Sequence, residues 1–501
     1  MARETYMGNK AKALLLAVFF VLLCFSCKEP RREIVTPYSN LPFPNYVSDE
    51  EASAFIKDDF TILPNFFSHL PLVIFDVPEG KVPPNHRWDY EKGYPVPIPG
   101  AEPYIRGEII VIDNKEGENR LKDKPAFVSP MQIHSTGVTR DFNEKGQYRI
   151  DLLSRRGIRE NFPLLGMESG DEWELLATTK DKSLIRDFLL LTMASKIMRF
   201  TPEARYCEVL LKDGEDYHYQ GVFLLVQPVR QSLKFLTASG FILRRDSYNP
   251  EEIMLETYAS RINSSSGYLD LVYPNENITG RLLSGIEESI SQMERILYST
   301  TPVVYVNYPE YLDMDSFIDY CLLNEYFMNI DAGFHSTYLY KEAKGKITAG
   351  PVWDNSGSFD NRGFEDDLKK VSFFEAPWFD QVTRDLTFLR KLENRFSNLR
   401  RVLLSDDAVL RLVDETARYL GSAQQRDWKR WAHVYTGTYE NELTKIKYML
   451  VEHSKVIGDQ IQRMTWNREL MDSSYSNLRS TFLVVGFIVL YFLSVWIARR
   501  R

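Results

Sequence analysis

Two aspartates, Asp331 and Asp354, stand at either end of a predicted β-hairpin in this 501-residue chain. Phosphoryl transfer uses two acidic groups of this kind. One accepts a proton from the attacking hydroxyl, and the other holds a metal ion that neutralises the phosphate charge. The alternative interpretation is that each aspartate caps a turn or a helix end, which is the commonest role of a single aspartate.

A helix and the two strands of the hairpin are expected to position these acids. Apolar residues in the stretch 317–327 follow helical spacing, and Asp315 and Ser316 ahead of them are candidate N-cap residues. Strands are expected at 337–340 and 347–352, joined by a turn. The first acid therefore follows the helix, and the second follows the last strand.

The segments NIDAGFHSTYLY and AGPVWDNSGSFDN resemble the core of the CotH kinases, a family of atypical protein kinases. The resemblance implies that Asp331 is the catalytic base, which orients and deprotonates a substrate hydroxyl. It also implies that Asp354, together with Asn355, binds the Mg²⁺ or Mn²⁺ that bridges the phosphates of ATP. Asn324 and Glu325 match an Asn-Glu pair of the family and are expected to support the site. Two acids in matching motifs favour an active site over two unrelated caps.

Basic residues in the first half of the chain are, by the same resemblance, candidates for binding ATP. The block STGVTRDFNEKGQYRIDL supplies Lys145 and Arg149. A later block supplies Lys182 and Arg186, four residues apart on one face near a helix start, where they would add positive charge to a phosphate site. The alternative for this second pair is a solvated helix face. Gln227, at the end of a predicted strand, is the last residue expected to bind the nucleotide.

Three positions depart from the family pattern. Gln227 stands where a glutamate is expected near the nucleotide, Gly146 replaces the second lysine of a pair, and Ser356 replaces a second aspartate. Other oxygen donors lie close to that last position, namely Asn355, Asp360 and Asn361. The departures leave a second function open, in which a catalytically weakened or inactive kinase-fold protein acts as a cell-surface binding module.

The expected fold class is α+β. The resemblance covers about residues 68–462 and implies a two-lobed, atypical protein-kinase-like domain at 68–465, with a β-rich N-terminal lobe and a mainly helical C-terminal lobe. Strand patterns separated by Pro- and Gly-rich connections come first, and helical patterns follow between 375 and 465, which is compatible with this architecture.

The two ends of the chain predict attachment to a membrane. Residues 1–27 are typical of a signal peptide, with Cys27 as a candidate for lipid attachment, and residues 28–67 resemble a linker. Residues 481–498 are uninterrupted apolar sequence, roughly 27 Å long as a helix, which predicts a transmembrane helix. Three arginines follow it, so we expect a single-pass C-terminal anchor in the cell membrane with the main domain outside the cytoplasm.

Composition limits the possible functions. The formal net charge of −8 argues against a nucleic-acid partner, and 44% hydrophobic residues are typical of a globular protein with a core. Cys207 and Cys321 are expected to be core residues. The expected function is therefore that of a membrane-tethered kinase, which transfers the γ-phosphate of ATP to Ser or Thr of a surface or secreted protein.

Overall fold

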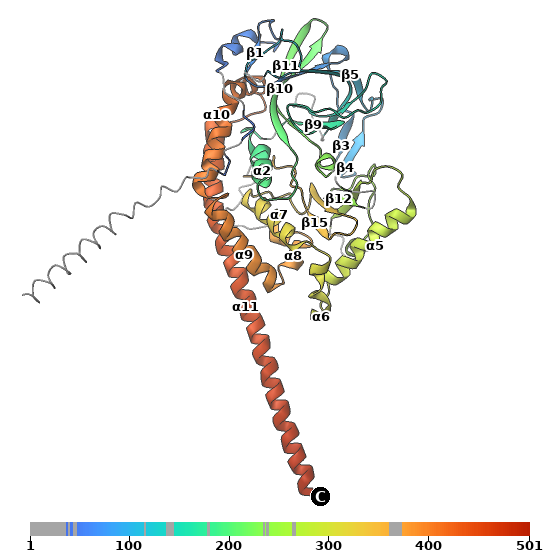
Figure 1. The fold of residues 1–501 in the computed structure, drawn as a ribbon, viewed down its shortest axis with the longest axis vertical. Coiled ribbons are helices and arrows are strands. Elements are labelled where there is room, and N and C mark those ends of the chain that lie inside the picture. Colours follow the sequence, from blue (N-terminus) through green and yellow to red (C-terminus); the bar gives the residue numbers. More distant parts are fainter. Residues whose placement is uncertain are drawn as a thin grey trace, which may run out of the picture. The chain divides into compact units, whose positions relative to one another are not determined.

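The computed structural model, drawn in Figure 1, describes residues 37–38, 41–43, 48–114, 117–136, 145–177, 181–233, 236, 240–262, 267–359 and 373–500. Within these ranges, the side chains of residues 231, 232, 373 and most of 474–500 are not described. The chain divides into two compact units, Met1–Leu41 and Pro42–Arg501, and every feature below belongs to the second. The predicted leader, residues 1–27 with Cys27, lies outside the described residues.

A closed barrel of seven strands forms the first part of the second unit. Its strands follow the order β10-β11-β9-β8-β7-β5-β2, and β10 pairs with β2 in parallel while the other pairs are antiparallel. The strands are β2 (Leu72–Asp76), β5 (Ile105–Ile112), β7 (Phe127–Thr136), β8 (Gln147–Leu152), β9 (Glu172–Leu176), β10 (Ala204–Asp213) and β11 (Asp216–Val226). Apolar side chains that alternate along each strand fill its interior.

Shorter elements surround the barrel. They are η1 (Glu50–Phe55), β1 (Phe67–Ser68), η2 (Pro78–Gly80), β3 (His86–Asp89), β4 (Tyr94–Pro97), β6 (Asn119–Arg120) and α2 (Arg186–Ala194). Residues 48–67, which belong to the predicted linker, are folded here. Ala52, Ile62 and Phe66 are buried against the outer face of the barrel.

A four-stranded sheet and several helices follow, in the order β13-β12-β14-β15 within the sheet (Figure 1). The elements are α3 (Val229–Ser232), β12 (Phe241–Asp246), α4 (Tyr258–Ile262), β13 (Tyr268–Tyr273), α5 (Gly280–Leu297), α6 (Pro302–Tyr305), η4 (Tyr308–Glu310), α7 (Met314–Tyr326), β14 (Thr337–Lys341), β15 (Ile347–Ala349), η5 (Phe373–Glu375), α8 (Phe379–Val382), α9 (Leu386–Arg401), α10 (Asp406–Arg430) and α11 (Tyr439–Arg500). The described chain is therefore a mixed α+β fold.

Two helix starts differ from the sequence prediction. The N-cap of α7 is Asp313, whose carboxylate accepts a hydrogen bond from the backbone N–H of Ser316, so neither Asp315 nor Ser316 is the cap. Lys182 and Arg186 were expected on one face near a helix start, but the helix begins only at Arg186, so Lys182 precedes it. Asp181 nevertheless satisfies this helix start, because its carboxylate accepts from the backbone N–H groups of Ser183 (2.9 Å) and Arg186 (2.8 Å).

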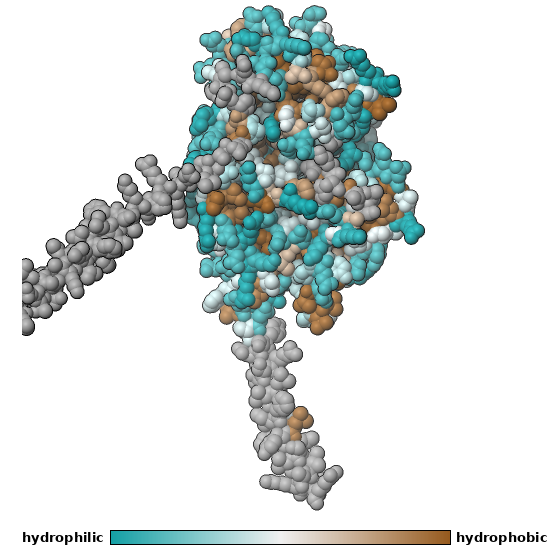
Figure 2. Space-filling view, viewed as in Figure 1, coloured by the Kyte–Doolittle hydropathy of each residue, from teal (hydrophilic) through white to brown (hydrophobic). Residues whose placement is uncertain are grey.

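The predicted transmembrane anchor is wrong. Residues 481–498 form the last part of α11, which runs without interruption from Tyr439 and carries charged residues along much of its length. Among the described residues, no helix combines the length and the apolar composition that crossing a bilayer requires. The expected membrane partner and single-pass localisation depended on this anchor and are therefore not supported. On the face of the molecule in Figure 2, hydrophilic residues predominate and apolar residues occur in separate groups.

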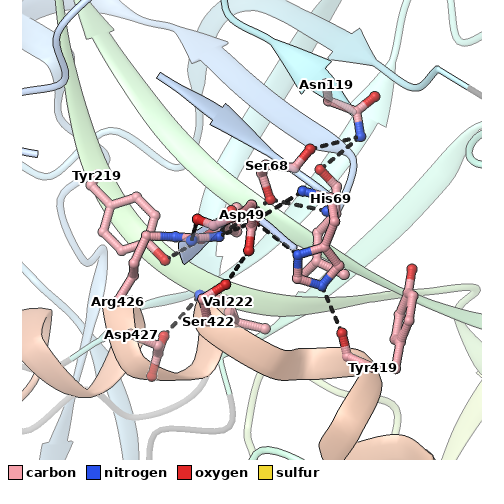
Figure 3. A network of polar contacts seen from close by, with 12 residues as sticks. Asp49, Ser68, His69, Asn119, Tyr219, Val222, Tyr419, Ser422, Arg426 and Asp427 are labelled. Carbon is pink, nitrogen blue, oxygen red and sulfur yellow. Dashed lines mark hydrogen bonds and ion pairs between the residues drawn. The ribbon is translucent and has the colours of Figure 1, made fainter. Parts of the chain in front are cut away.

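A buried polar network fixes α10 to the barrel (Figure 3). The Arg426 guanidinium donates to both carboxylate oxygens of Glu208 on β10 (2.9 Å each) and to Asp49 (2.8 Å). Asp49 also shares a hydrogen bond with His69 Nδ1 (2.8 Å) and accepts one from the Ser422 hydroxyl. Burial alone would raise the pKa of Asp49, but the bonds from His69 and Arg426 hold it well below its usual value.

Strand β11 passes unusually close to α10 at Gly221. This glycine has φ +110°, and a Cβ atom there would lie 2.2 Å from Asp427 Oδ1. The carboxylate cannot move away easily, because Oδ1 accepts from Lys145 Nζ (2.7 Å) and from the Val222 backbone N–H (2.8 Å). We expect Gly221→Ala to lower the free energy of unfolding by about 2–4 kcal/mol, measured by urea denaturation.

The matched control is Gly214→Ala in the turn of the same hairpin. Gly214 also has a positive φ of +61°, but no atom lies within 4 Å of the added Cβ position. Only the backbone strain remains there, so we expect a loss of about 1 kcal/mol. Equal losses in the two variants would contradict the close approach of Asp427 to Gly221.

Candidate active site

The loop after α7 carries Asp331, and Asn329 connects it to the segment that carries Asp354. Asn329 Nδ2 donates to the backbone carbonyl of Asp354 (3.1 Å) and to Asn324 Oδ1 (3.2 Å). Asn329 Oδ1 accepts from the backbone N–H of Asp331 (3.3 Å). One buried amide therefore connects the two acidic segments, and the Asn324 side chain accepts a hydrogen bond from that amide.

Asp354 lies just after β15 in an uncommon backbone conformation. Its φ is +56°, which a residue with a Cβ adopts at a steric cost. Its Oδ1 accepts a hydrogen bond from the Ser356 hydroxyl (2.9 Å). Ser356, which stands where the family has a second aspartate, thus orients the first aspartate.

The start of α2 is hydrogen-bonded to the segment that follows Asp354. Asn355 donates from its backbone N–H to Asp187 Oδ1 (2.6 Å) and from Nδ2 to the backbone carbonyl of Arg186 (2.9 Å). Arg186 Nε donates to the backbone carbonyl of Ser358 (2.9 Å). The Asp354 segment is therefore fixed to the first two residues of α2, both of which are buried.

Asp187 is the site residue that the sequence did not reveal. Its pKa is raised to about 8, first by burial and second by the negative charge of Asp354. The only sequence signal was its position immediately after Arg186, where an acid in the first turn of a helix is ordinary. The structure adds a second carboxylate beside Asp354, one that is buried and lacks an ion-pair partner among the described residues.

Two neighbouring carboxylates fit a magnesium ion. Mg²⁺ in kinase sites is commonly bound by one or two carboxylates, with waters and substrate phosphates as the remaining ligands. Within the described ranges, no group of three or more His, Cys, Asp or Glu side chains could hold a metal ion. Asp187 and Asp354 form a pair and not such a group, so they would supply only part of the ligands of a Mg²⁺ ion, with waters and phosphates as the rest. The Asn355 side chain is engaged elsewhere, because its Oδ1 accepts from the Ser358 hydroxyl. Asp360 and Asn361 lie outside the described residues.

Two of the predicted basic residues lie at this end of α2. Arg186 is fully buried and its guanidinium donates to Asp181 and to Glu442 of α11 (3.2 Å). Lys182 donates to Thr436 Oγ1 (3.0 Å) and lies 3.8 Å from a Glu442 carboxylate oxygen. Arg186 therefore serves the packing of the site, whereas Lys182 is partly exposed beside it.

Lys145 lies inside the barrel and is paired with α10. Nζ donates to Asp427 Oδ1 (2.7 Å) and to the Val222 carbonyl, and it lies 4.7 Å from the centre of the Phe223 ring. Burial lowers the pKa of Lys145, although the Asp427 carboxylate opposes that shift. None of these contacts involves the Asp354 segment.

Arg149 lies in a large cleft between the barrel and the second sheet. Its guanidinium contacts Glu172 (3.1 Å) and Glu174 (2.9 Å) on β9. The cleft has a volume of about 860 Å³ and is also lined by residues of β12 and β13. Tyr338 of β14 lines it too, and its ring lies 6.4 Å from that of Trp353, the residue before Asp354. Tyr338 is thus the lining residue that contacts the segment before Asp354, whereas Asp187, Asp331 and Asp354 do not line the cleft.

The remaining predicted residues have structural contacts. Gln227 is buried, and its Nε2 donates to the Glu168 carbonyl (3.0 Å) while its Oε1 accepts from the Glu203 backbone N–H (3.4 Å). Glu325 shares a buried contact of 3.1 Å with His453 of α11. The structure thus brings Asp331, Asp354 and Asn355 together, but Lys145, Arg149 and Gln227 each contact other groups.

A family of known proteins matches this chain. The sequence model of the family described as CotH kinase protein matches residues 133–456. This match lies inside the region for which the sequence suggested a resemblance, and it begins at β7 of the barrel. No curated protein matches the chain.

Proposed function

Because the chain belongs to the CotH kinase family, we propose that it is a protein kinase that transfers the γ-phosphate of ATP to a Ser or Thr hydroxyl. The observation that carries this proposal is the bridge through Asn329, which binds the Asp331 loop to the backbone of Asp354. A base for the acceptor hydroxyl and a carboxylate for a metal ion must be held at a fixed separation during phosphoryl transfer.

The residues have separate roles in this reaction. Asp331 accepts the proton of the substrate hydroxyl as transfer begins. Asp354 and Asp187 hold the divalent cation, which supplies positive charge to the phosphates when it is bound. Ser356 and Asn355 position these two carboxylates through the hydrogen bonds from the Ser356 hydroxyl and the Asn355 backbone N–H.

The cleft beside this site is the candidate place for the nucleotide. A volume of about 860 Å³ is within the range of small-molecule sites. Arg149 and Arg244 contribute guanidinium groups to its lining, and Pro228 next to Gln227 forms part of its wall. Guanidinium groups are suited to binding phosphates, although both are ion-paired here and would have to exchange partners.

A second function, a binding protein on the same fold, is supported by one observation. Lys145 and Gln227, both expected to contact ATP, are buried and engaged in internal hydrogen bonds. A protein that had lost nucleotide binding would keep such residues only for packing. The two functions differ in whether ATP and a divalent cation bind.

Thermal unfolding of the full chain with ATP and Mg²⁺ or Mn²⁺ distinguishes them. For the kinase, we expect metal-dependent stabilisation by ATP of about 2.7 kcal/mol at a concentration 100 times the Kd. We expect Asp354→Ala to lose this shift, because the variant lacks one of the two carboxylates that hold the cation.

The matched control is Asp216→Ala at the exposed first residue of β11. This variant should retain the full shift. If the unmodified chain shows no shift with any combination of nucleotide and metal, the binding-protein function replaces the kinase assignment. If Asp354→Ala keeps the shift, the metal-binding role of Asp354 is wrong.

A further inference from the structure

One end of the barrel interior is polar, unlike the rest of it. Ser135 on β7 is the direct partner of Tyr148 on β8. Both side chains point inward, because they alternate with outward positions and continue the rows that contain Ile133 and Ile150. These two hydroxyl groups line a cavity of about 810 Å³ at the mouth of the barrel. Barrel mouths are frequent locations of ligand sites.

The Tyr148 hydroxyl has no hydrogen-bond partner among the described residues. The Tyr148 side chain is only 6% exposed, so solvent reaches little of it. The hydroxyl oxygen is not one of the fully enclosed polar atoms that lack a partner in the described structure, so it is open to the cavity and can bond to water or to a ligand there. Burial raises the pKa of Tyr148 to about 12, so the hydroxyl keeps its proton and can donate it to a ligand.

Arg430, at the end of α10, lines the same cavity. Its guanidinium lies 4.7 Å from the Phe60 ring and 4.4 Å from the Trp431 ring. Nε donates to the Tyr219 carbonyl (3.1 Å), which leaves both Nη groups available. Within the described part of the chain, no carboxylate forms an ion pair with Arg430. The cavity therefore contains a guanidinium group that lies between two aromatic rings. Its two Nη groups form no ion pair with a carboxylate of the described residues.

The other charges limit which anion this cavity can bind. Lys81 adds a second cation to the lining, but Asp59, Glu79 and Asp213 also line the cavity. A dianion such as a phosphate monoester would be repelled by these three carboxylates, whereas a single negative charge paired with Arg430 is repelled less. Rings and aliphatic groups from Phe60, Leu211 and Trp431 supply an apolar wall beside the guanidinium.

We propose that the mouth of the barrel binds a small organic carboxylate with an aromatic or otherwise apolar body. The carboxylate accepts from the Nη groups of Arg430 and from the Tyr148 hydroxyl, and the apolar body packs against the aromatic wall. This site uses none of the residues proposed for phosphoryl transfer, so it is independent of the kinase assignment.

Titration calorimetry of the full chain with 2-naphthoate tests this site. We expect the unmodified protein to bind it, and Arg430→Gln and Tyr148→Phe each to weaken binding by at least about tenfold, because each loses a hydrogen bond to a charged group. Arg418→Gln, at an exposed position of α10, and Asp354→Ala should bind as the unmodified protein does. Naphthalene-2-carboxamide, which lacks the charge, should bind at least about tenfold more weakly than 2-naphthoate.

Several outcomes would overturn the proposal. They are an absence of 2-naphthoate binding, equal binding of the neutral amide, and unchanged binding in either Arg430→Gln or Tyr148→Phe. Tighter binding of naphthyl phosphate than of 2-naphthoate would show that the ligand class is wrong. Tyr148→Phe removes only a hydroxyl that has no partner in the described structure, so it should fold, and circular dichroism confirms this before the titration. Loss of binding in Asp354→Ala would place the ligand in the candidate active site and exclude the barrel mouth.

Discussion

Asp331→Asn is expected to lower the rate of phosphoryl transfer by about 10³-fold while leaving the binding of Mg²⁺ and ATP intact. The substitution keeps the shape of the side chain but removes the group that accepts the substrate proton, a contribution typically of 10²–10⁴-fold. The backbone N–H of Asp331, which donates to Asn329, is unaffected by the change. The measurement is transfer of labelled γ-phosphate from ATP to a mixture of Ser- and Thr-rich proteins, with thermal shift as the readout of binding.

Asp315→Asn is the matched control for this variant. Asp315 lies in the first turn of α7, is largely exposed, and contacts Lys391 on the surface (3.0 Å). Transfer by this variant should equal that of the unmodified chain. If Asp331→Asn retains full activity, Asp331 is not the base. If Asp331→Asn loses ATP binding as well as transfer, the residue acts in holding the site together through the Asn329 bridge.

The two functions proposed for this fold place different demands on the same hydrogen bonds. Transfer requires Asp331 and Asp354 at a fixed separation, and Asn329 supplies this through bonds to the backbone of both. A binding protein has no need of that precision, and it has no need of a second buried carboxylate at Asp187. Burial and the negative charge of Asp354 raise the pKa of Asp187, and a bound cation would oppose this shift by stabilising the charged form. A cation held by Asp187 and Asp354 is thus a requirement of the kinase proposal and not of the binding protein.

The local features of the site were predictable from the sequence, because they depend on neighbours in the chain. The helix, the hairpin and the two acids at its ends follow from spacing and turn residues within about fifty positions. The structure places α7, β14 and β15 where these signals predicted a helix and two strands. The exact caps were not predicted, since Asp313, Asp315 and Ser316 are all acceptable cap residues.

Contacts between residues far apart in the sequence were not predictable, because no local sequence pattern indicates which distant residues meet. Asp187 bonds to Asn355 across 168 positions, and Lys145 bonds to Asp427 across 282. In the sequence, Lys145 is a basic residue near a Gly-containing turn, and its resemblance to a phosphate-binding lysine was the strongest available signal. Its contact with an acid from α10 inside the barrel could not be expected from that signal. The transmembrane helix predicted at 481–498 from apolar composition was also wrong, since no helix among the described residues is both long and apolar enough to cross a membrane.

Arg426→Met is expected to lower the free energy of unfolding by about 3–5 kcal/mol at pH 7. The variant keeps an apolar side chain of similar length, but it leaves the buried carboxylates of Asp49 and Glu208 without the guanidinium that now bonds to both (Figure 3). Removing one partner of a buried ion pair typically costs this much, because the remaining charge is uncompensated. The measurement is urea denaturation of the full chain, compared with Arg418→Met at an exposed position of the same helix, which should change stability by less than about 0.5 kcal/mol.

The pH dependence of Arg426→Met separates a charge effect from a packing effect. The pKa of Asp49 is depressed in the folded chain, so its contribution is present above the unfolded value of about 3.9 and is lost as the pH falls below it. The variant lacks the part of this contribution that comes from Arg426, and protonation of Asp49 at low pH removes the negative charge that Arg426 no longer compensates. The stability difference between the two proteins should therefore narrow from pH 7 to pH 3. A difference that stays constant over this range would show that Arg426 stabilises α10 through its packing on Phe66, whose ring lies 5.8 Å away, and not through Asp49.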